Sequence, residues 1–280
     1  MKSLTMMAIL LLVTGGFVIL PVAADVTFQS SSPQTIVQGD GFSIHGTGAT
    51  NDSIAIWVIG RDYFEARLVT PDEKGVYTYV LEPGETKNFS SGQYAVVIQD
   101  PGANRQFEIT SLISDTGNIT FRNNGVVYAD VGYKQNIGTD VHPVLAQVLD
   151  TKTNLLTDDI ITPYYFFVEL PFLHFDRAAD SGSDVTLRIP ASEKSTVISG
   201  TTNMGTENIL TVMVNSADTN KLLISTKIPV VSGNNGTKNY LNRWSYERDP
   251  SGLPVGDYFM TVGWQKDQSS GTGTILFTVQ

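Results

Sequence analysis

Short stretches of this chain alternate bulky apolar side chains with polar ones, and clusters of Gly, Asn, Asp, Ser and Pro separate the stretches. An alternation with a period of two is typical of β-strands that bury one face. The clearest stretches of the first half lie at residues 42–46, 54–58, 76–80 and 94–98. Short strands at this spacing predict a β fold built from sandwiches.

The same order of stretches returns in the second half of the chain. Four segments there match earlier ones in sequence character, and the pairs are 197–201 with 43–47, 209–214 with 54–58, 244–246 with 77–79, and 256–262 with 92–98. Four matches in one order indicate two copies of one structural unit. The predicted fold class is therefore mainly β, with two tandem Ig-like β-sandwich domains and a connecting segment that contains one short α-helix.

A Gly-x-Tyr sequence opens the last matched segment of both copies and places Tyr94 and Tyr258 at equivalent positions. Glycine lets the chain turn into a strand, and the tyrosine can bury its ring while its hydroxyl bonds the backbone at the corner of the sandwich. We interpret both tyrosines as packing residues. A ligand-binding tyrosine is the alternative.

The stretch between the two copies has a different pattern. Its middle predicts a helix, because Asp140 can cap it, Pro143 stands in the first turn, and apolar residues recur at positions 144, 145, 148 and 149. A strand is expected at residues 164–170. The predicted parts are a signal peptide at 1–24, an N-terminal sandwich at 25–114, a mixed connecting segment at 115–177 and a C-terminal sandwich at 178–280.

The first residues have the pattern of an export signal. Lys2 supplies a positive start, residues 4–20 form an apolar run, and small residues at 21–24 offer a cleavage site before Asp25. An uncleaved membrane anchor is the alternative, because the run approaches the roughly 20 residues that span a bilayer. No second long apolar run follows, so we expect an extracellular, cell-surface chain without a transmembrane segment after cleavage.

Charge and cysteine content narrow the range of functions. The formal net charge of −10 disfavours nucleic acid and anionic lipid surfaces as partners. The chain has no cysteine, which excludes disulfides, thiolate metal sites and a cysteine nucleophile. Buried apolar area must therefore hold the domains together, and hydrophobic residues make up 41% of the chain.

The sequence contains no recognisable catalytic motif. The three histidines, His45, His142 and His174, lie far apart and lack metal-ligand spacing. Residues 115–117 match the Asp-Thr-Gly tripeptide of aspartic proteases, but the required second copy is missing and a turn is the simpler interpretation. We predict that the chain is not an enzyme. A secreted hydrolase whose carboxylates pair in space is the alternative.

Three kinds of candidate binding or modification residue follow from residue type. Asp176, Asp180 and Asp184 form the best candidate Ca²⁺ cluster, and a solvated linker is the alternative because the EF-hand order of ligands is missing. Trp264 and Tyr63 are candidate ligand-binding aromatics, on which a sugar could stack. Glycosylation acceptors of the form Asn-x-Ser/Thr occur in predicted turns or beside strand ends, at Asn51, Asn88, Asn118 and Asn235.

Several segments of the sequence occur in an order that is characteristic of one family. They cover most of the mature chain and lie at residues 56–60 with Tyr63, then at 75–79, 85–88, 91–101, 144–149, 164–171 and 200–203. In this order they resemble the S-layer-like surface glycoproteins of methanogenic archaea. The resemblance implies export, N-glycosylation and a structural role in or near the envelope, with no catalytic residues to carry over. The last predicted strand ends at Gln280, without the Thr-rich stalk or carboxyl-terminal anchoring helix of those proteins.

These observations together predict a non-catalytic secreted protein that is a structural or adhesive component of the archaeal S-layer or envelope, or is associated with it. The expected partners are other envelope or S-layer proteins, or further copies of the chain, which would meet through strand edges or sandwich faces. An extracellular carbohydrate- or ligand-binding module is the alternative, with glycans as its partners. No cofactor is expected apart from the candidate Ca²⁺.

Overall fold

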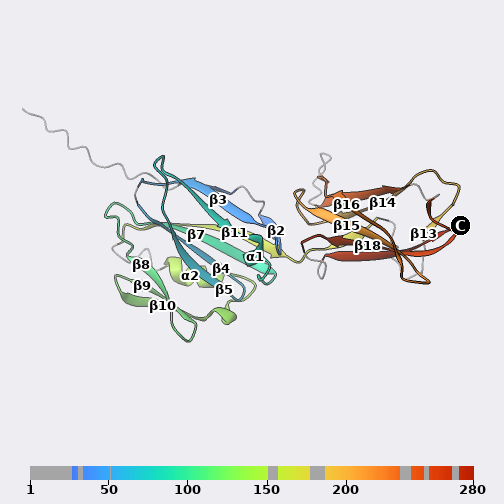
Figure 1. The fold of residues 1–280 in the computed structure, drawn as a ribbon. Coiled ribbons are helices and arrows are strands. Elements are labelled where there is room, and N and C mark those ends of the chain that lie inside the picture. Colours follow the sequence, from blue (N-terminus) through green and yellow to red (C-terminus); the bar gives the residue numbers. More distant parts are fainter. Residues whose placement is uncertain are drawn as a thin grey trace, which may run out of the picture.

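Figure 1 shows the computed structural model of the protein, which describes residues 27–30, 34–50, 52–150, 157–176, 187–233, 241–248, 252–266 and 271–280. Strands dominate these residues and the helical segments are short, so the prediction of a mainly β fold with tandem sandwiches is confirmed. Several predicted features lie outside the described residues, namely the signal peptide at 1–24, Asn51, Asp180, Asp184 and Asn235. Among the helices of the described residues, none has the length and apolar character needed to cross a membrane.

The first sandwich packs a three-stranded sheet against a five-stranded sheet. The three-stranded sheet has the order β1 (Thr27–Ser30), β3 (Phe42–Thr47), β6 (Val76–Leu81). The five-stranded sheet has the order β2 (Thr35–Val37), β11 (Ile160–Glu169), β7 (Gly92–Asp100), β4 (Ile54–Gly60), β5 (Tyr63–Val69). The alternating pattern turns Phe42, Ile56 and Phe166 into the core between the sheets, where the rings of Phe42 and Phe166 stack with centroids 4.4 Å apart.

The second sandwich repeats this arrangement. Its three-stranded sheet has the order β12 (Leu173–Phe175), β14 (Thr196–Thr202), β17 (Asn242–Arg248). Its five-stranded sheet has the order β13 (Leu187–Ile189), β19 (Thr272–Val279), β18 (Gly256–Trp264), β15 (Ile209–Ser216), β16 (Leu222–Pro229). In both copies the first strand of the larger sheet runs parallel to the last strand of the sandwich, and the remaining neighbours are antiparallel.

Strand order therefore supports the internal repeat that the sequence predicts. Each matched pair of segments occupies the same place in its sandwich, so that β14 corresponds to β3, β15 to β4, β17 to β6 and β18 to β7. The two tyrosines also act as predicted. The Tyr94 hydroxyl donates to the Ser90 carbonyl at 3.0 Å, and the Tyr258 hydroxyl donates to the Pro254 carbonyl at 2.6 Å. Both rings are buried.

The copies differ in what joins their last two strands. In the second copy only residues 265–271 separate β18 from β19, whereas an inserted unit separates β7 from β11 in the first copy. This inserted unit consists of β8 (Ile109–Ile113), β9 (Asn118–Asn123), β10 (Val126–Tyr133), the 3-10 helix η1 (Lys134–Asn136) and α2 (His142–Asp150). The helix prediction is confirmed, and Asp140 Oδ1 accepts a hydrogen bond from the His142 amide at 2.9 Å.

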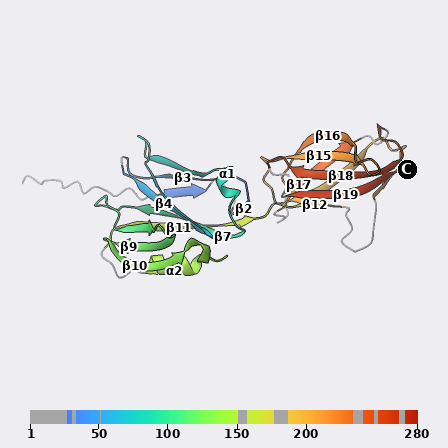
Figure 2. The same cartoon turned by 60° about the horizontal axis from the view of Figure 1, so that its bottom comes forward.

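The inserted unit covers the outer face of the first five-stranded sheet. Figure 2 shows β9, β10 and α2 lying below β11 and β7. Trp57 and Val97 of the sheet pack with Phe121 and Leu145 of the insert in a second apolar core. This core explains why every residue of β4 is buried, since one face of the strand meets the first core and the other meets the insert.

Residues 115–177, which were expected to form a connecting segment, contribute to three units. They supply β9, β10 and α2 to the insert, β11 to the first sandwich and β12 to the second. Only Leu170, Pro171 and Phe172 separate β11 from β12. The two sandwiches are therefore joined by three residues, and the geometry of that junction depends on side chains from both copies.

Candidate functional site

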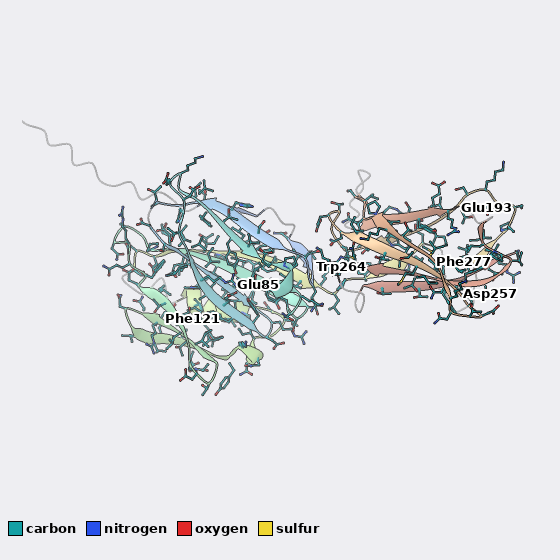
Figure 3. All side chains as sticks on the ribbon, in the orientation of Figure 1. Glu85, Phe121, Glu193, Asp257, Trp264 and Phe277 are labelled. Carbon is teal, nitrogen blue, oxygen red and sulfur yellow. The ribbon has the colours of Figure 1, made fainter. Side chains whose placement is uncertain are left out.

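Buried polar side chains from both copies meet at the contact between the two sandwiches. Figures 1 and 2 show the sandwiches lying end to end around this junction. Figure 3 places Trp264 at the end of the second sandwich that faces the first, whereas Glu193 and Asp257 lie near its opposite end.

Asp40 of the first sandwich is the centre of the junction. Only 5% of the residue is exposed, and Asn208 Nδ2 of the second sandwich donates to its Oδ1 at 3.1 Å. Lys266 Nζ lies 3.5 Å from the same oxygen. Trp264 Nε1 completes the group by donating to Asn208 Oδ1 at 3.0 Å. We call Asp40, Asn208, Trp264 and Lys266 the junction network.

Burial sets the electrostatics of this network. Removal from water raises the pKa of Asp40 above its usual value, and the nearby Glu207 charge raises it further, whereas the Asn208 hydrogen bond and Lys266 lower it. The Lys266 ammonium also lies 5.4 Å from the centroid of the Trp264 ring, where a cation is attracted to the ring face. Burial therefore disfavours the ionised form of Asp40, and Asn208 and Lys266 offset this effect only in part.

The turn that carries Asp40 fits closely against the second sandwich. Gly39 has φ of 90°, in the left-handed region that glycine adopts most easily, and a Cβ at this position would lie 3.0 Å from the Trp264 ring. The Asp40 amide donates to the Val37 carbonyl at 2.8 Å, which closes the turn. Val37 itself packs in the core of the second sandwich. The first copy thus contributes an apolar side chain to its neighbour.

Asn203 fixes the three-residue connector on the other side of the junction. Its Nδ2 donates to Glu169 Oε2 at 3.1 Å and to the Leu170 carbonyl at 2.9 Å, and its Oδ1 accepts from the Phe172 amide at 3.1 Å. A single amide side chain therefore bonds both ends of the connector. These contacts and the junction network resist bending between the sandwiches.

A cleft of about 1080 Å³ opens beside the junction. Its lining includes acidic, basic and amide side chains: Gln34, Asp40, Glu169, Asn203, Glu207 and Lys266. The lining also includes Ile36, Val37 and Leu241, so the cleft offers a ligand both apolar and polar groups. Among the described residues, no group of three or more His, Cys, Asp or Glu side chains is arranged to hold a metal ion.

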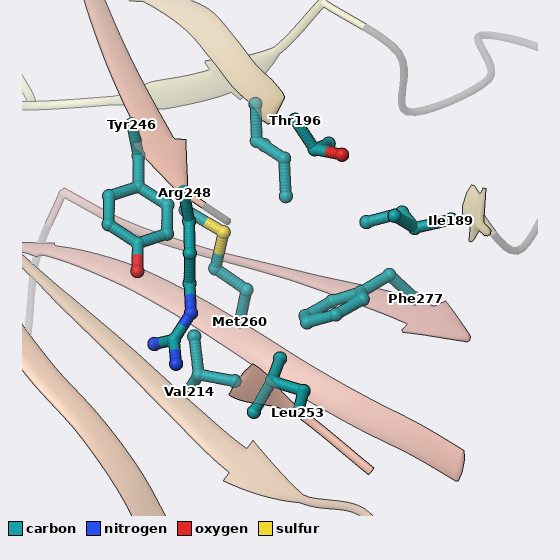
Figure 4. A pocket seen from close by; sticks show the side chains of 9 residues that line it. Ile189, Thr196, Val214, Tyr246, Arg248, Leu253, Met260 and Phe277 are labelled. Atoms are coloured by element: carbon teal, nitrogen blue, oxygen red, sulfur yellow. The ribbon is translucent and has the colours of Figure 1, made fainter. Parts of the chain in front are cut away.

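A second cavity lies inside the second sandwich and is much smaller. Figure 4 shows Val214, Met260 and Phe277 among its lining side chains, with Arg248 alongside. Its volume is about 20 Å³, close to the space of one water molecule. This cavity is a gap in side-chain packing and is too small for a ligand.

The structure does not bring the predicted histidines and acids together. His45 bonds Thr78 at 3.0 Å, and His142 bonds Asp140 at 2.8 Å. Asp176, the described member of the candidate Ca²⁺ cluster, accepts from Ser199 at 2.7 Å and forms an ion pair with Arg243. Calcium binding at Asp176, Asp180 and Asp184 stays a prediction.

The two candidate ligand-binding aromatics are not exposed platforms. Trp264 is 1% exposed, because its ring lies under Gly39 and its indole nitrogen bonds Asn208. Tyr63 is half-buried and its hydroxyl donates to Glu65 Oε2 at 2.6 Å. Stacking on a sugar requires an open ring face, and the Trp264 ring has none here. The other two tryptophans, Trp57 and Trp244, are buried as well.

Two of the predicted glycosylation acceptors lie within the described residues. Asn88 is exposed, just after the short helix α1 (Pro83–Thr86), and its Nδ2 donates to the Gly84 carbonyl at 3.1 Å. Asn118 is half-buried at the start of β9, and its Nδ2 donates to Asp130 Oδ1 at 3.0 Å. Exposure therefore favours Asn88 as the more accessible acceptor.

Sequence reasoning missed most of the junction network. Asp40 stands between two glycines and has the pattern of an ordinary turn residue. Asn208 and Lys266 likewise stand in polar loops beside strands. Of the network, the sequence analysis singled out Trp264, as a candidate ligand-binding residue, and Asn203, which bonds the connector, fell within the segment at 200–203. Pairing between copies was not visible in a single sequence.

Fold and junction together define a protein of two tandem Ig-like β-sandwiches, with a unit inserted in the first and a buried polar contact between them. No protein-family model and no curated protein matches the chain.

Among solved structures, a tetra-tandem repeat from the extending region of a large adhesion protein has a TM-score of 0.27 and 13% identity, covering 91% of this chain and 74% of that chain. A Ca²⁺-stabilized adhesin with which an Antarctic bacterium binds ice has a TM-score of 0.21 and 13% identity, covering 92% and 73%. A bacterial ice-binding adhesin of 1.5 MDa has a TM-score of 0.20 and 13% identity, covering 92% and 98%. These TM-scores carry no argument about function.

Proposed function

We propose that the chain is a non-catalytic, secreted cell-surface protein that serves as a structural or adhesive component of the archaeal S-layer or envelope, or is associated with it. The observation that carries the proposal is the buried contact of Asp40 with Asn208 between two sandwiches joined by three residues. A buried contact of this kind limits rotation between two domains, which suits a protein that holds another surface at a fixed distance. The export pattern at residues 1–24 and the resemblance to S-layer-like glycoproteins support the same location.

Fractionation of native cells tests this proposal. An antibody against the mature chain is expected to detect it in the envelope pellet, with the mature chain beginning at Asp25. Intact mass of the recovered protein would also report glycans, with Asn88 as the first expected acceptor. Recovery in the cytosolic fraction with residues 1–24 still attached would contradict the proposal.

The cleft beside the junction favours one further candidate function, the recognition of a polar ligand such as a glycan. The mixed polar lining supports this candidate. A glycan array probed with the mature chain would test it, using Glu207→Gln to alter the exposed rim of the cleft. Glu193→Gln is the matched control, because Glu193 is also exposed but lies near the opposite end of the second sandwich. Binding that is lost only with Glu207→Gln supports recognition in the cleft, whereas an array without specific signals argues against it.

A further inference from the structure

Two buried acids lie where the inserted unit meets the first sandwich. Glu108 stands directly before β8, at the start of the insert, and Asp159 stands directly before β11, at its end. Glu108 is 8% exposed and Asp159 is 1% exposed. Among the described residues, neither carboxyl forms an ion pair with a lysine or an arginine. Burial of an unpaired charge is costly, so this arrangement needs an explanation.

Asp159 closes the base of the insert through one of its two oxygens. Oδ2 accepts from the Ile109 amide at 2.7 Å and from Gln99 Nε2 at 2.8 Å. Gln99, on β7, also donates from Nε2 to the Ile109 carbonyl at 2.7 Å. These bonds join three parts of the chain at one point: β7 of the five-stranded sheet, β8 of the insert and the residue before β11.

The Thr157 hydroxyl connects the Glu108 carboxyl to the backbone amide of Asp159. Thr157 Oγ1 donates to Glu108 Oε2 at 3.0 Å and accepts from the Asp159 amide at 3.1 Å. Asn104 Nδ2 also bonds Glu108 Oε1. The second oxygen of Asp159, Oδ1, is buried without a hydrogen-bond partner. The neighbouring Glu108 side chain is within hydrogen-bonding reach of Asp159, but two ionised carboxylates offer acceptors only.

We propose that Glu108 and Asp159 share one proton, and that this acid pair holds the two ends of the insert together in a pH-dependent manner. A proton on either carboxyl supplies the O–H donor that the pair otherwise lacks. It also removes the repulsion between two like charges in a site of low dielectric constant. The same proton gives the unpartnered oxygen a hydrogen-bonding role and lowers the buried charge from two to one, and the Ile109 amide, Gln99 and Asn104 donate to the charge that is left.

Electrostatics of the surroundings agree with this assignment. Burial, followed by the Glu108 charge and its hydrogen bond, raises the pKa of Asp159 to about 6, against the lowering effect of the Ile109 amide and Gln99. Two arginines lie near the start of the insert: Arg105 forms an ion pair with Asp52 at 3.4 Å, and Arg122 of β9 stands opposite Thr110. The acids closest in sequence to the pair are Asp100, at the end of β7, and Asp158. Asp158 Oδ2 accepts from the Asn104 amide at 3.0 Å and Asp100 Oδ1 from the Gly102 amide at 2.7 Å. Both are acids, so neither offsets the charge of the pair.

A bound cation is the competing explanation for two facing carboxylates. Calcium takes six to eight oxygen ligands, commonly from several carboxylates. Among the described residues, no third acid joins Glu108 and Asp159 in a metal-binding group. The shared proton therefore accounts for the site with the groups that are present, and calcium becomes an outcome of the test.

The direction of the pH effect follows from the pKa. Because the folded pKa of Asp159 is raised from 3.8 to about 6, the folded state binds the proton more tightly than the unfolded chain does. The stabilisation is fully present below about pH 4 and is lost as pH rises through about 6. A shift of about two pH units corresponds to a roughly 100-fold increase in the opening constant of the insert between pH 4 and pH 7.

Carboxyl ¹³C NMR titration of the mature chain, with hydrogen exchange of the Ile109 amide corrected for its intrinsic rate, tests the proposal. Asp159 is expected to titrate near pH 6 in the wild type and lower in Glu108→Gln, which keeps a hydrogen-bonding amide. Asp159→Asn is expected to make the opening constant independent of pH over this range. Asp158→Asn is the matched control, since it changes the adjacent exposed acid and should leave the titration of Asp159 raised.

Two results would overturn the proposal. One is an Asp159 carboxyl that titrates near pH 4 and does not respond to Glu108→Gln. The other is protection of the Ile109 amide at pH 7 by millimolar calcium chloride, reversed by a chelator and absent in Asp159→Asn, which would assign the pair to a cation. The Glu108→Gln titration decides the question even if Asp159→Asn fails to fold.

Discussion

Replacement of the buried Asn208 by alanine is expected to lower the free energy of unfolding more than replacement of an exposed asparagine does. The substitution removes the bond from Asn208 Nδ2 to Asp40 and the acceptor of Trp264 Nε1. Trp264 then keeps a buried N–H with no partner, and Asp40 keeps only Lys266 at 3.5 Å. The unpaired Trp264 N–H costs about 1–3 kcal/mol and the lost bond to Asp40 about 1 kcal/mol more, so the free energy of unfolding is expected to fall by about 2–4 kcal/mol.

Urea unfolding followed by tryptophan fluorescence measures this loss, and small-angle X-ray scattering reports whether the two sandwiches still hold one relative orientation. Asn215→Ala is the matched control, because Asn215 also makes two side-chain hydrogen bonds, both to Asn220, but in an exposed hairpin. The control is expected to cost less than about 0.5 kcal/mol. Equal effects of the two substitutions, or an unchanged scattering curve for Asn208→Ala, would refute the role given to the junction network.

Two further predictions concern the sandwiches themselves. Tyr258→Phe removes the hydroxyl that bonds the Pro254 carbonyl at 2.6 Å and is expected to cost about 1–2 kcal/mol in urea unfolding; an unchanged midpoint would show that this corner bond adds nothing. Gly60→Ala places a Cβ 1.9 Å from the buried Tyr94 ring and is expected to cost about 1–3 kcal/mol, whereas Gly84→Ala, with open space around its Cβ, should leave the melting temperature nearly unchanged.

The repeat was predictable because both copies use the same short-range patterns. Alternation at 54–58 and 209–214 places side chains in a core whichever strands lie beside them, and the Gly-x-Tyr sequence carries its own hydrogen bond to the backbone. Strand β11 was different. Its pairing with β7 spans the whole insert, and nothing local to residues 160–169 distinguishes a strand of the first sandwich from one in a connecting segment.

The junction was not predictable for a related reason. Asp40 and Asn208 are 168 residues apart, and each stands in a sequence context that is typical of exposed turns. Trp264 was interpreted as a ligand-binding aromatic, but its ring packs in the core of the second sandwich and Gly39 of the neighbouring copy lies against it. The acid pair Glu108 and Asp159 is hidden in the same way, since its members come from opposite ends of the insert.

Because the insert belongs to the first copy, the two ends of the tandem pair differ. Ile56 pairs with Ile98 in the first copy as Val212 pairs with Val262 in the second, which makes Asp52 the counterpart of Asn208 and Asp100 the counterpart of Trp264. In the second copy, the Asn208 amide and the Trp264 indole contact the preceding sandwich. The first copy has the two acids Asp52 and Asp100 at the equivalent place, next to the start of the insert, and so lacks the amide and the indole that form this junction.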